Sequence, residues 1–340
     1  MRAIIYRQTG DPDVLQLVER PEPKPANYEV LVRIAVSGVN PTDYKTRRGT
    51  KPGDPLAFAE MVPNQDGAGT IIAVGAGVDP KRIGERVWLW EAAYQRANGT
   101  AQEFVAIPGS HAVPLPDSAS WALGASLGVP ARTAHRCLTI SEHSPATLAP
   151  QSLAGVHVLV AGGAGAVGHA AIELAKWAGA IVITTVSSPE KASLASAAGA
   201  DHVINYRSAK ATKEIRSIAP SGVDIVVEVS PHANSDLDQA VLADNGTVAI
   251  YANDANDMTV PIRPSMVRNA NYRFILLYGI PTEAKRQSLV DVQAALGDGA
   301  LTVGAASGLP LHHFSLENTA LAHAAVENAT VGKVLIDIHP

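Results

Sequence analysis

The sequence predicts an α/β protein in which a doubly wound parallel sheet is inserted into a β-rich domain. Residues 128–280 alternate helical patterns with near-continuous apolar strands, which is typical of a parallel sheet covered by helices. Residues 1–127 show short strands separated by Gly, Pro and Asn turns, which predicts an antiparallel, partly barrel-like region. Residues 281–340 hold one more helix and a last strand, and we expect this segment to return to the first domain.

The expected elements follow from these periodicities in chain order. In the first domain the predicted strands are Ala3–Tyr6, Leu15–Glu19, Val30–Val36, Gly69–Val74, Arg86–Leu89 and Gln102–Ile107. In the second they are Val156–Ala161, Ile181–Val186, His202–Asn205, Asp224–Val229, Thr247–Tyr251 and Phe274–Tyr278. The closing segment is predicted to contain a helix, Glu283–Leu296, and a strand, Lys333–Ile338.

The first strand of the parallel sheet runs directly into a glycine-rich turn. This turn is Gly163-x-Gly165-x-x-Gly168, and a helical pattern that contains Ala166 and Val167 follows it. Glycines at these positions permit a tight turn, close approach of a pyrophosphate and close helix packing, so that phosphates meet the free N–H groups of the helix N-terminus. These five residues are therefore predicted to bind a dinucleotide. The alternative is a glycine-rich turn in an α/β domain that binds no nucleotide.

Composition restricts the class of protein. The chain has 340 residues, 46% of them apolar, and a net charge of −5. Because the charges are interspersed and no apolar run reaches the ~20 residues of a membrane span, we expect a soluble protein that binds neither nucleic acid nor membrane. The single cysteine, Cys137, excludes an intramolecular disulfide, and the N-terminus lacks a signal-peptide pattern. A cytoplasmic location is expected.

The end of the second parallel strand predicts the choice of nicotinamide cofactor. An Asp or Glu usually stands there in domains that select NAD, to bind the ribose hydroxyl. Here Ser187 and Ser188 can donate to a phosphate and Lys191 can supply positive charge, which favours NADPH. The alternatives are that Ser188 caps a helix that begins at Pro189, that Lys191 is a solvated residue, and that nearby Glu190 repels phosphate.

Motifs spread over the whole length resemble one enzyme family. The chain resembles the medium-chain dehydrogenase/reductases of the zinc-independent quinone oxidoreductase branch. The motifs are Met1-Arg-Ala with Gly10-x-Pro12-x-Val14-Leu15, Ser37-Gly-Val-Asn-Pro-Thr-Asp43 with Arg47 and Gly49, Asp66-x-Ala68-Gly69, Val129-Pro130-x-x-Thr133-Ala134, Ala161 to Gly168, Gly199 to Tyr206, and Gly332-Lys333-Val334. The resemblance implies a Rossmann-type NADP-binding domain over 128–280. It also implies a GroES-like catalytic domain over 1–127, to which 281–340 return.

The resemblance also implies that no metal takes part. Zinc-dependent relatives carry a cysteine ligand where this chain has Asn40, and a Gly-His-Glu stretch where it has Gln65-Asp66-Gly67. The four-cysteine lobe of those relatives is missing. A catalytic zinc needs about three protein ligands, and we interpret the adjacent pair His312-His313 as loop residues. No metal site is predicted.

Site residues for the acceptor follow from the resemblance. Asn40 corresponds to the residue that lies beside the nicotinamide, although it is also a plausible turn residue before a proline. Relatives often have a tyrosine at the position of Lys45, so Tyr44 and Lys45 are both candidate proton donors, with packing and surface exposure as their alternatives. Asp43 is expected to be structural, held by an ion pair with Arg47.

The resemblance extends to the cofactor contacts. It implies that Thr133 lies at the nicotinamide ribose, Tyr206 packs on the adenine, Asn234 lines the nicotinamide half and Lys333 lies near the site. The alternatives are a helix-interior threonine, a tyrosine buried in the sheet and a surface lysine.

The predicted activity is transfer of hydride from NADPH to a quinone or an α,β-unsaturated carbonyl. An enoyl-thioester reductase and a non-catalytic NADPH-binding sensor or RNA-binding protein remain as alternatives. A homodimer or homotetramer is expected, paired through the apolar run Phe274–Tyr278, which would otherwise be an exposed sheet edge.

Overall fold

The computed structural model describes residues 1–142, 144–253 and 256–339, which form two compact units. One unit comprises residues 1–129 and 310–340, and the other residues 130–309. The helix α9 (Thr282–Gly297) belongs to the second unit, where it packs on α3 (Arg132–Thr139). From the sequence, this helix was expected in the segment that returns to the first domain.

The first unit is built on a seven-stranded sheet whose path is β14-β15-β3-β4-β5-β7, with β6 paired to β3. Its strands are β3 (Glu29–Val39), β4 (Asp66–Val74), β5 (Arg86–Leu89), β6 (Phe104–Pro108), β7 (Ala112–Pro114), β14 (Leu311–Ser315) and β15 (Lys333–Asp337). A separate hairpin joins β1 (Arg2–Ile5) and β2 (Gln16–Glu19). The helices are α1 (Pro41–Arg48), α2 (Trp121–Gly124) and α10 (Thr319–Glu327).

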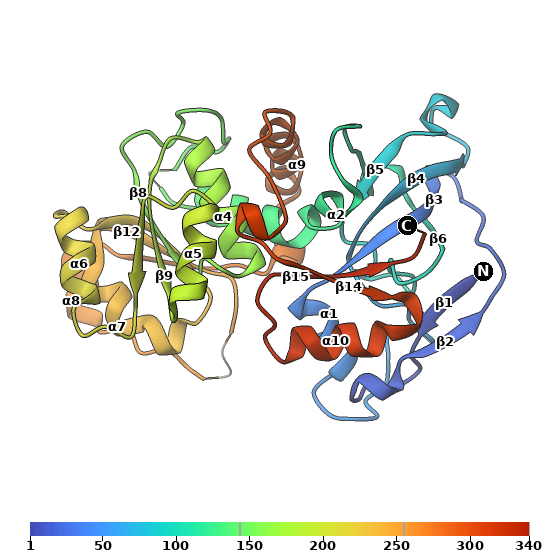
Figure 1. Cartoon of the computed structure of the whole chain (residues 1–340), viewed down its shortest axis with the longest axis horizontal. Helices are drawn as coiled ribbons and strands as arrows, with labels where there is room; N and C mark the ends of the chain where they lie inside the picture. The colour runs from blue at the N-terminus through green and yellow to red at the C-terminus, as the bar shows by residue number, and fades with distance from the viewer. Residues whose placement is uncertain (143, 254–255, 340) are drawn as a thin grey trace. The chain divides into compact units, whose positions relative to one another are not determined.

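The last strand of the chain joins the first unit, as predicted. β15 pairs antiparallel with β3, with Val334 opposite Val39, so that residues almost 300 positions apart in sequence become neighbours (Figure 1). β14 was not predicted from the sequence and pairs parallel to β15. It contains His312 and His313, so the interpretation of these histidines as loop residues is wrong. Their apolar neighbours Leu311 and Phe314 are only partly buried, which gave a weak strand pattern.

The second unit holds a six-stranded parallel sheet in the order β10-β9-β8-β11-β12-β13. Its strands are β8 (His157–Ala161), β9 (Ile181–Val186), β10 (His202–Asn205), β11 (Val223–Glu228), β12 (Leu242–Ile250) and β13 (Asn271–Phe274). Besides α3 and α9, its helices are α4 (Ala166–Trp177), α5 (Pro189–Ala197), α6 (Ala211–Ile218), α7 (Pro231–Val241) and α8 (Ile262–Arg268). The order reverses between β8 and β11, which is the doubly wound arrangement that was predicted.

The sixth parallel strand differs from the prediction. β13 ends at Phe274, where the predicted strand began, and Leu277–Gly279 form a short 3-10 turn. The apolar run misled the prediction because Phe274 and Leu276 are 72% and 68% exposed and therefore do not mark a buried strand. The polar segment that precedes the run pairs with β12 instead, with Asn271 opposite Thr247.

Each unit has its own apolar core. In the first, buried residues of β3, β4, β6 and β15 such as Val32, Ile71 and Ile336 pack together. In the second, Leu159, Ile183 and Val226 form the centre of the parallel sheet. Within the described ranges, no helix combines the length and the apolar character that crossing a membrane requires.

Candidate active site and cofactor site

The turn between β8 and α4 has the geometry of a phosphate-binding loop. Gly162 has φ +71°, and α4 begins at Ala166 after Gly165. A Cβ on Gly163 would lie 2.2 Å from Thr184 Oγ1, and one on Gly168 would lie 2.4 Å from the Gly162 carbonyl oxygen. Packing within the unit thus requires glycine at both positions.

Gly165 is a glycine for a different reason. It has φ −86°, which any residue can adopt, and a Cβ at this position would have its nearest neighbouring atom 3.5 Å away. The protein itself therefore leaves space at this position. Beside it, the first N–H groups of α4, those of Ala166, Val167 and Gly168, have no acceptor within the helix. Free N–H groups next to open space fit the pyrophosphate of a dinucleotide.

Two polar side chains meet at the carboxyl end of β9. The ammonium group of Lys191 donates a hydrogen bond of 3.2 Å to Ser187 Oγ. Ser188 is the N-cap of α5: its oxygen accepts the Lys191 backbone N–H at 3.4 Å, and its hydroxyl contact lowers the pKa of Glu190. Ser187 and Lys191 therefore form a donor pair, whereas Ser188 and Glu190 interact with each other at the helix start.

Tyr206 lies beside this donor pair. It follows β10, its backbone N–H donates to the Val186 carbonyl oxygen at 3.1 Å, and the residue is 44% exposed. This exposure is inconsistent with a tyrosine buried in the sheet. An exposed ring next to the end of β9 can stack on an aromatic base.

Of the residues expected at the nicotinamide end, Thr133 is buried and Asn234 is hydrogen-bonded within the protein. Thr133 is 5% exposed on α3. The amide of Asn234 donates to both carboxylate oxygens of Glu228, at 3.0 and 3.2 Å. Asn234 thus orients a buried acid at the end of β11.

Glu228 and its neighbour Asp238 form a buried carboxyl pair that was not predicted from the sequence. Both are buried, and the Ser230 backbone N–H donates to Glu228. Burial, followed by the charge of Glu228, raises the pKa of Asp238 well above its usual value. The signal available in the sequence was a glutamate directly after the apolar run Ile225–Val227.

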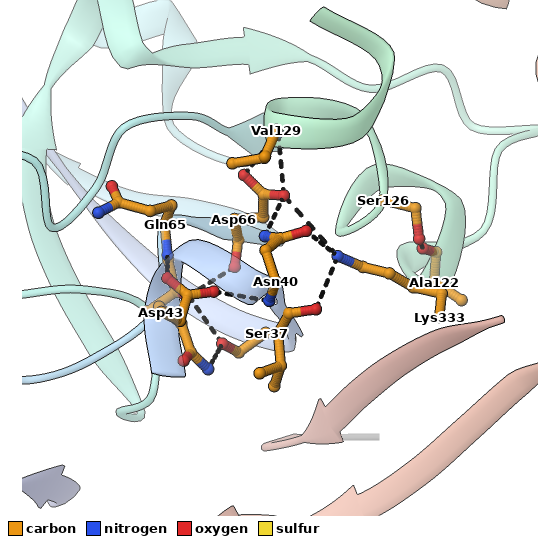
Figure 2. Close-up of polar contacts among 12 residues, drawn as sticks. Ser37, Asn40, Asp43, Gln65, Asp66, Ala122, Ser126, Val129 and Lys333 are labelled. Atoms are coloured by element: carbon orange, nitrogen blue, oxygen red, sulfur yellow. Dashed lines mark hydrogen bonds and ion pairs between the residues drawn. The ribbon is translucent and has the colours of Figure 1, made fainter. Parts of the chain in front are cut away.

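In the first unit, Asn40 lies at the centre of a buried polar cluster that joins β3, β4 and β15 (Figure 2). The Lys333 ammonium donates to Asn40 Oδ1 at 2.7 Å, and Asn40 Nδ2 donates to Asp66 Oδ2 at 2.8 Å. Lys333 Nζ also donates to the Val39 carbonyl oxygen at 3.1 Å and lies 3.9 Å from Asp66 Oδ2. Asn40, Asp66 and Lys333 are 2%, 0% and 1% exposed. We call these three residues the amide cluster.

Asp66 is fixed from a second side. Its two carboxylate oxygens accept the Val129 backbone N–H, each at 3.0 Å, and the Thr100 hydroxyl donates to its carbonyl oxygen at 2.5 Å. A Cβ on Gly128 would lie 2.1 Å from Asp66 Oδ1. The carboxylate can take this position only because residue 128 is glycine.

Asp43 lies next to the amide cluster and holds the start of α1. Its carboxylate accepts the Asn40 backbone N–H at 2.7 Å and the Gln65 backbone N–H at 3.1 Å. Burial and then the charge of Asp66 raise its pKa to about 7, although the two N–H groups act in the opposite direction. The expected ion pair of Asp43 with Arg47 is wrong, because Arg47 binds Glu327 at 2.7 Å and the Gly10 carbonyl oxygen.

The comparisons with known proteins extend over almost the whole chain. Rat quinone oxidoreductase is 30% identical over 340 residues, which cover 99% of this chain and 97% of that protein. The chain belongs to the quinone oxidoreductase family. Human quinone oxidoreductase is 28% identical over 341 residues, with the same coverage. Residues 26–117 match the alcohol dehydrogenase GroES-like domain and residues 166–294 match the zinc-binding dehydrogenase model.

Solved structures of the quinone oxidoreductase family give the same assignment. Escherichia coli quinone oxidoreductase complexed with NADPH has a TM-score of 0.81 and 25% identity, over 99% of this chain and 100% of that one. A mycobacterial protein complexed with NADPH has a TM-score of 0.80 and 28% identity, with the same coverage. The prediction of a GroES-like domain with an inserted Rossmann-type domain is confirmed.

The other two acceptor candidates lie apart from the amide cluster. Lys45 is exposed and Tyr44 is half-buried, with the Arg48 guanidinium 5.5 Å from the centre of its ring. Among the described residues, no hydrogen bond links either side chain to Asn40. Asn40 is thus the one acceptor-side candidate that the structure places within the buried cluster.

Because residues 166–294 match a zinc-binding dehydrogenase model, we searched the structure for side chains that could bind a metal ion. In the part of the chain that the structure describes, no group of three or more His, Cys, Asp or Glu side chains could hold a metal ion. Asn40, where the resemblance places a cysteine ligand in zinc-dependent relatives, accepts a hydrogen bond from the Lys333 ammonium, and Asp66 forms an ion pair with it.

Proposed function

We propose that this protein transfers hydride from NADPH to a quinone or an α,β-unsaturated carbonyl without a metal. The observation that carries the proposal is the donor pair Lys191–Ser187 at the carboxyl end of β9. In the same unit, the glycine loop has space beside Gly165 for a pyrophosphate. The relatives named quinone oxidoreductase, and those solved with NADPH, support the same substrate class and cofactor.

Each part of the cofactor has residues that can hold it. The N–H groups of Ala166, Val167 and Gly168, beside Gly163 and Gly165, bind the pyrophosphate. Lys191 and Ser187 bind the 2′-phosphate, Ser188 holds the helix start beside them, and Tyr206 stacks on the adenine. Thr133 and Asn234 belong to the nicotinamide end. When bound, NADPH supplies the hydride.

On the acceptor side, Asn40 is the residue that stabilises charge. As hydride arrives at the acceptor, negative charge develops on its oxygen, and a preorganised N–H donor stabilises that charge. Asn40 Nδ2 has one hydrogen bound to Asp66, and no described residue accepts the other. We assign this second N–H to the acceptor oxygen, and we assign the proton that follows to water, to the half-buried Tyr44 or to the exposed Lys45.

The charge distribution and the exposed apolar side chains bear on location and assembly. We propose a cytoplasmic protein that binds no nucleic acid, since the charges are interspersed. We also propose a homodimer or homotetramer in which a second copy covers the exposed apolar side chains of α8 and the β13 edge. These side chains are Ile262, Met266, Val267, Phe274 and Leu276.

The test is a comparison of acceptors at saturating NADPH with the purified protein. Absorbance of the reduced nicotinamide is followed with 9,10-phenanthrenequinone, a short-chain alkenal and crotonyl-coenzyme A. The proposal predicts oxidation of NADPH by the quinone or the alkenal. Oxidation by the thioester alone would support the enoyl-thioester reductase instead, and tight NADPH binding without any oxidation would support a non-catalytic role.

A further inference from the structure

Lys333 is a fully buried lysine whose ammonium group faces oxygen atoms of its own unit. Its Nζ lies 2.7 Å from Asn40 Oδ1, 3.1 Å from the Val39 carbonyl oxygen and 3.9 Å from Asp66 Oδ2. The first two oxygens accept hydrogen bonds from the ammonium group, and Asp66 is near enough for an ion pair. The residue is 1% exposed and therefore is not a surface lysine.

The surrounding backbone is shaped around the lysine stem. A Cβ on Gly38 would lie 3.2 Å from Lys333 Cε and 2.1 Å from the Ala125 carbonyl oxygen, so a side chain on residue 38 would occupy the space that the lysine fills. Burial lowers the pKa of Lys333, while the carboxylates of Asp66 and Asp43 raise it. The lysine is thus paired with opposite charge, as a buried cation must be.

Lys333 and Asp66 contact different ends of the Asn40 carboxamide, the oxygen Oδ1 and the nitrogen Nδ2. An ammonium can only donate, and an ionised carboxylate can only accept. Rotation of the carboxamide by half a turn would place Nδ2 against the ammonium and Oδ1 against the Asp66 carboxylate, and both new contacts would repel. Lys333 and Asp66 therefore permit one orientation of the Asn40 side chain, the one in Figure 2.

We propose that Lys333 is a positioning residue that locks the Asn40 carboxamide, so that the free Nδ2 hydrogen always faces the acceptor oxygen. The proposal rests on the reductase function proposed above. It differs from the role that the family resemblance implied for Lys333, a contact near the cofactor, because the buried ammonium group donates two hydrogen bonds to protein oxygens and forms an ion pair with Asp66.

A double-mutant cycle tests this proposal. Lys333→Met removes the charge and the donors while keeping an unbranched stem, and Asn40→Ala removes the group that Lys333 is proposed to position. We expect Lys333→Met to lower kcat by about 10- to 100-fold in the wild type, and by less than about 3-fold in the Asn40→Ala background. The NADPH dissociation constant, measured by fluorescence, should change less than about 2-fold. An equal loss of kcat in both backgrounds, or a parallel loss of NADPH affinity, would overturn the proposal.

Removal of the Lys333 charge alone can unfold the unit, because the buried Asp66 carboxylate then loses its nearby positive charge. The paired variant Lys333→Met/Asp66→Asn removes both charges of the Lys333–Asp66 ion pair and is the folded comparison. It should bind NADPH normally and still turn over slowly, because a neutral amide at position 66 accepts either end of Asn40. A wild-type kcat in this variant would contradict the positioning role.

A readout that needs no turnover separates the proposal from the proposed function. In protein labelled with [¹⁵N]asparagine, the side-chain NH₂ signal of Asn40 is assigned by its loss in Asn40→Ala. It should be a single sharp pair in the wild type, and should shift or broaden in the paired variant. An unchanged signal would overturn the positioning role, whether or not the wild type reduces quinones. If the signal shifts in the paired variant but the wild type has no reductase activity, the positioning role of Lys333 is supported and the proposed function is rejected.

Discussion

Replacement of Lys191 by alanine should selectively weaken NADPH binding. The Lys191 ammonium and Ser187 Oγ are 3.2 Å apart, so both can reach one phosphate. A hydrogen bond to a charged group contributes about 1.5–3 kcal/mol, and because Lys191 is half-buried we discount this to about 1–2 kcal/mol for screening. With 1.36 kcal/mol for each factor of ten, the NADPH dissociation constant should rise about 5- to 30-fold.

The assay is titration of the protein with NADPH and with NADH, followed by quenching of tryptophan fluorescence. NADH lacks the 2′-phosphate, so its dissociation constant should be the same in the wild type and in Lys191→Ala. Lys213→Ala, at an exposed lysine of α6 in the same unit, is the matched control and should change neither constant. Equal weakening of NADPH and NADH, or none of NADPH, would refute the assignment of Lys191 to the phosphate.

Four further experiments address other parts of the structure. Gly168→Ala should destabilise the protein by about 1–3 kcal/mol, since its Cβ would lie 2.4 Å from the Gly162 carbonyl oxygen, whereas Gly165→Ala should keep the melting temperature but lose NADPH affinity. Equal effects of these two changes on melting would contradict the distinction between packing and ligand approach. Gly128→Ala should displace Asp66, whose Oδ1 would lie 2.1 Å from the new Cβ, and lower stability by about 1–3 kcal/mol in thermal unfolding. For Asp43, the folded protein binds the proton more tightly than the unfolded chain, because the pKa rises from 3.8 to about 7; ionisation of Asp43 therefore lowers stability as the pH rises through this range. The melting temperature of Asp43→Asn minus that of the wild type should therefore rise between pH 4 and pH 7. A difference that stays constant over this range would refute the raised pKa of Asp43. Gel filtration of Phe274→Glu should show a smaller assembly than the wild type if a second copy covers this 72% exposed side chain.

Local patterns in the sequence were sufficient to predict most of the parallel sheet. The β8 strand, the glycine loop and α4 are contiguous, so periodicity and glycine spacing identify them together. The apolar run at Phe274 gave a wrong strand because burial depends on what covers a surface, and periodicity does not report this.

The polar interactions of the site were less predictable, because they join residues distant in sequence. Asn40 was named from a motif, but its link to Lys333 crosses 293 positions and depends on the pairing of β15 with β3. Arg47 was expected to pair with the nearby Asp43, whereas α10 supplies its carboxylate through Glu327. Glu228 and Asp238 were missed because their pairing depends on how α7 packs on β11, which the sequence pattern does not report.

The central claim is metal-independent hydride transfer with Asn40 as the donor to the acceptor oxygen. The most direct measurement is the single-turnover rate of quinone reduction by NADPH-loaded protein after treatment with a chelator, in the wild type and in Asn40→Ala. We predict that the wild type keeps its rate after chelation and that Asn40→Ala is slower by about 10²- to 10³-fold at unchanged NADPH affinity. Loss of the wild-type rate on chelation, or an Asn40→Ala rate equal to the wild type, would contradict the claim.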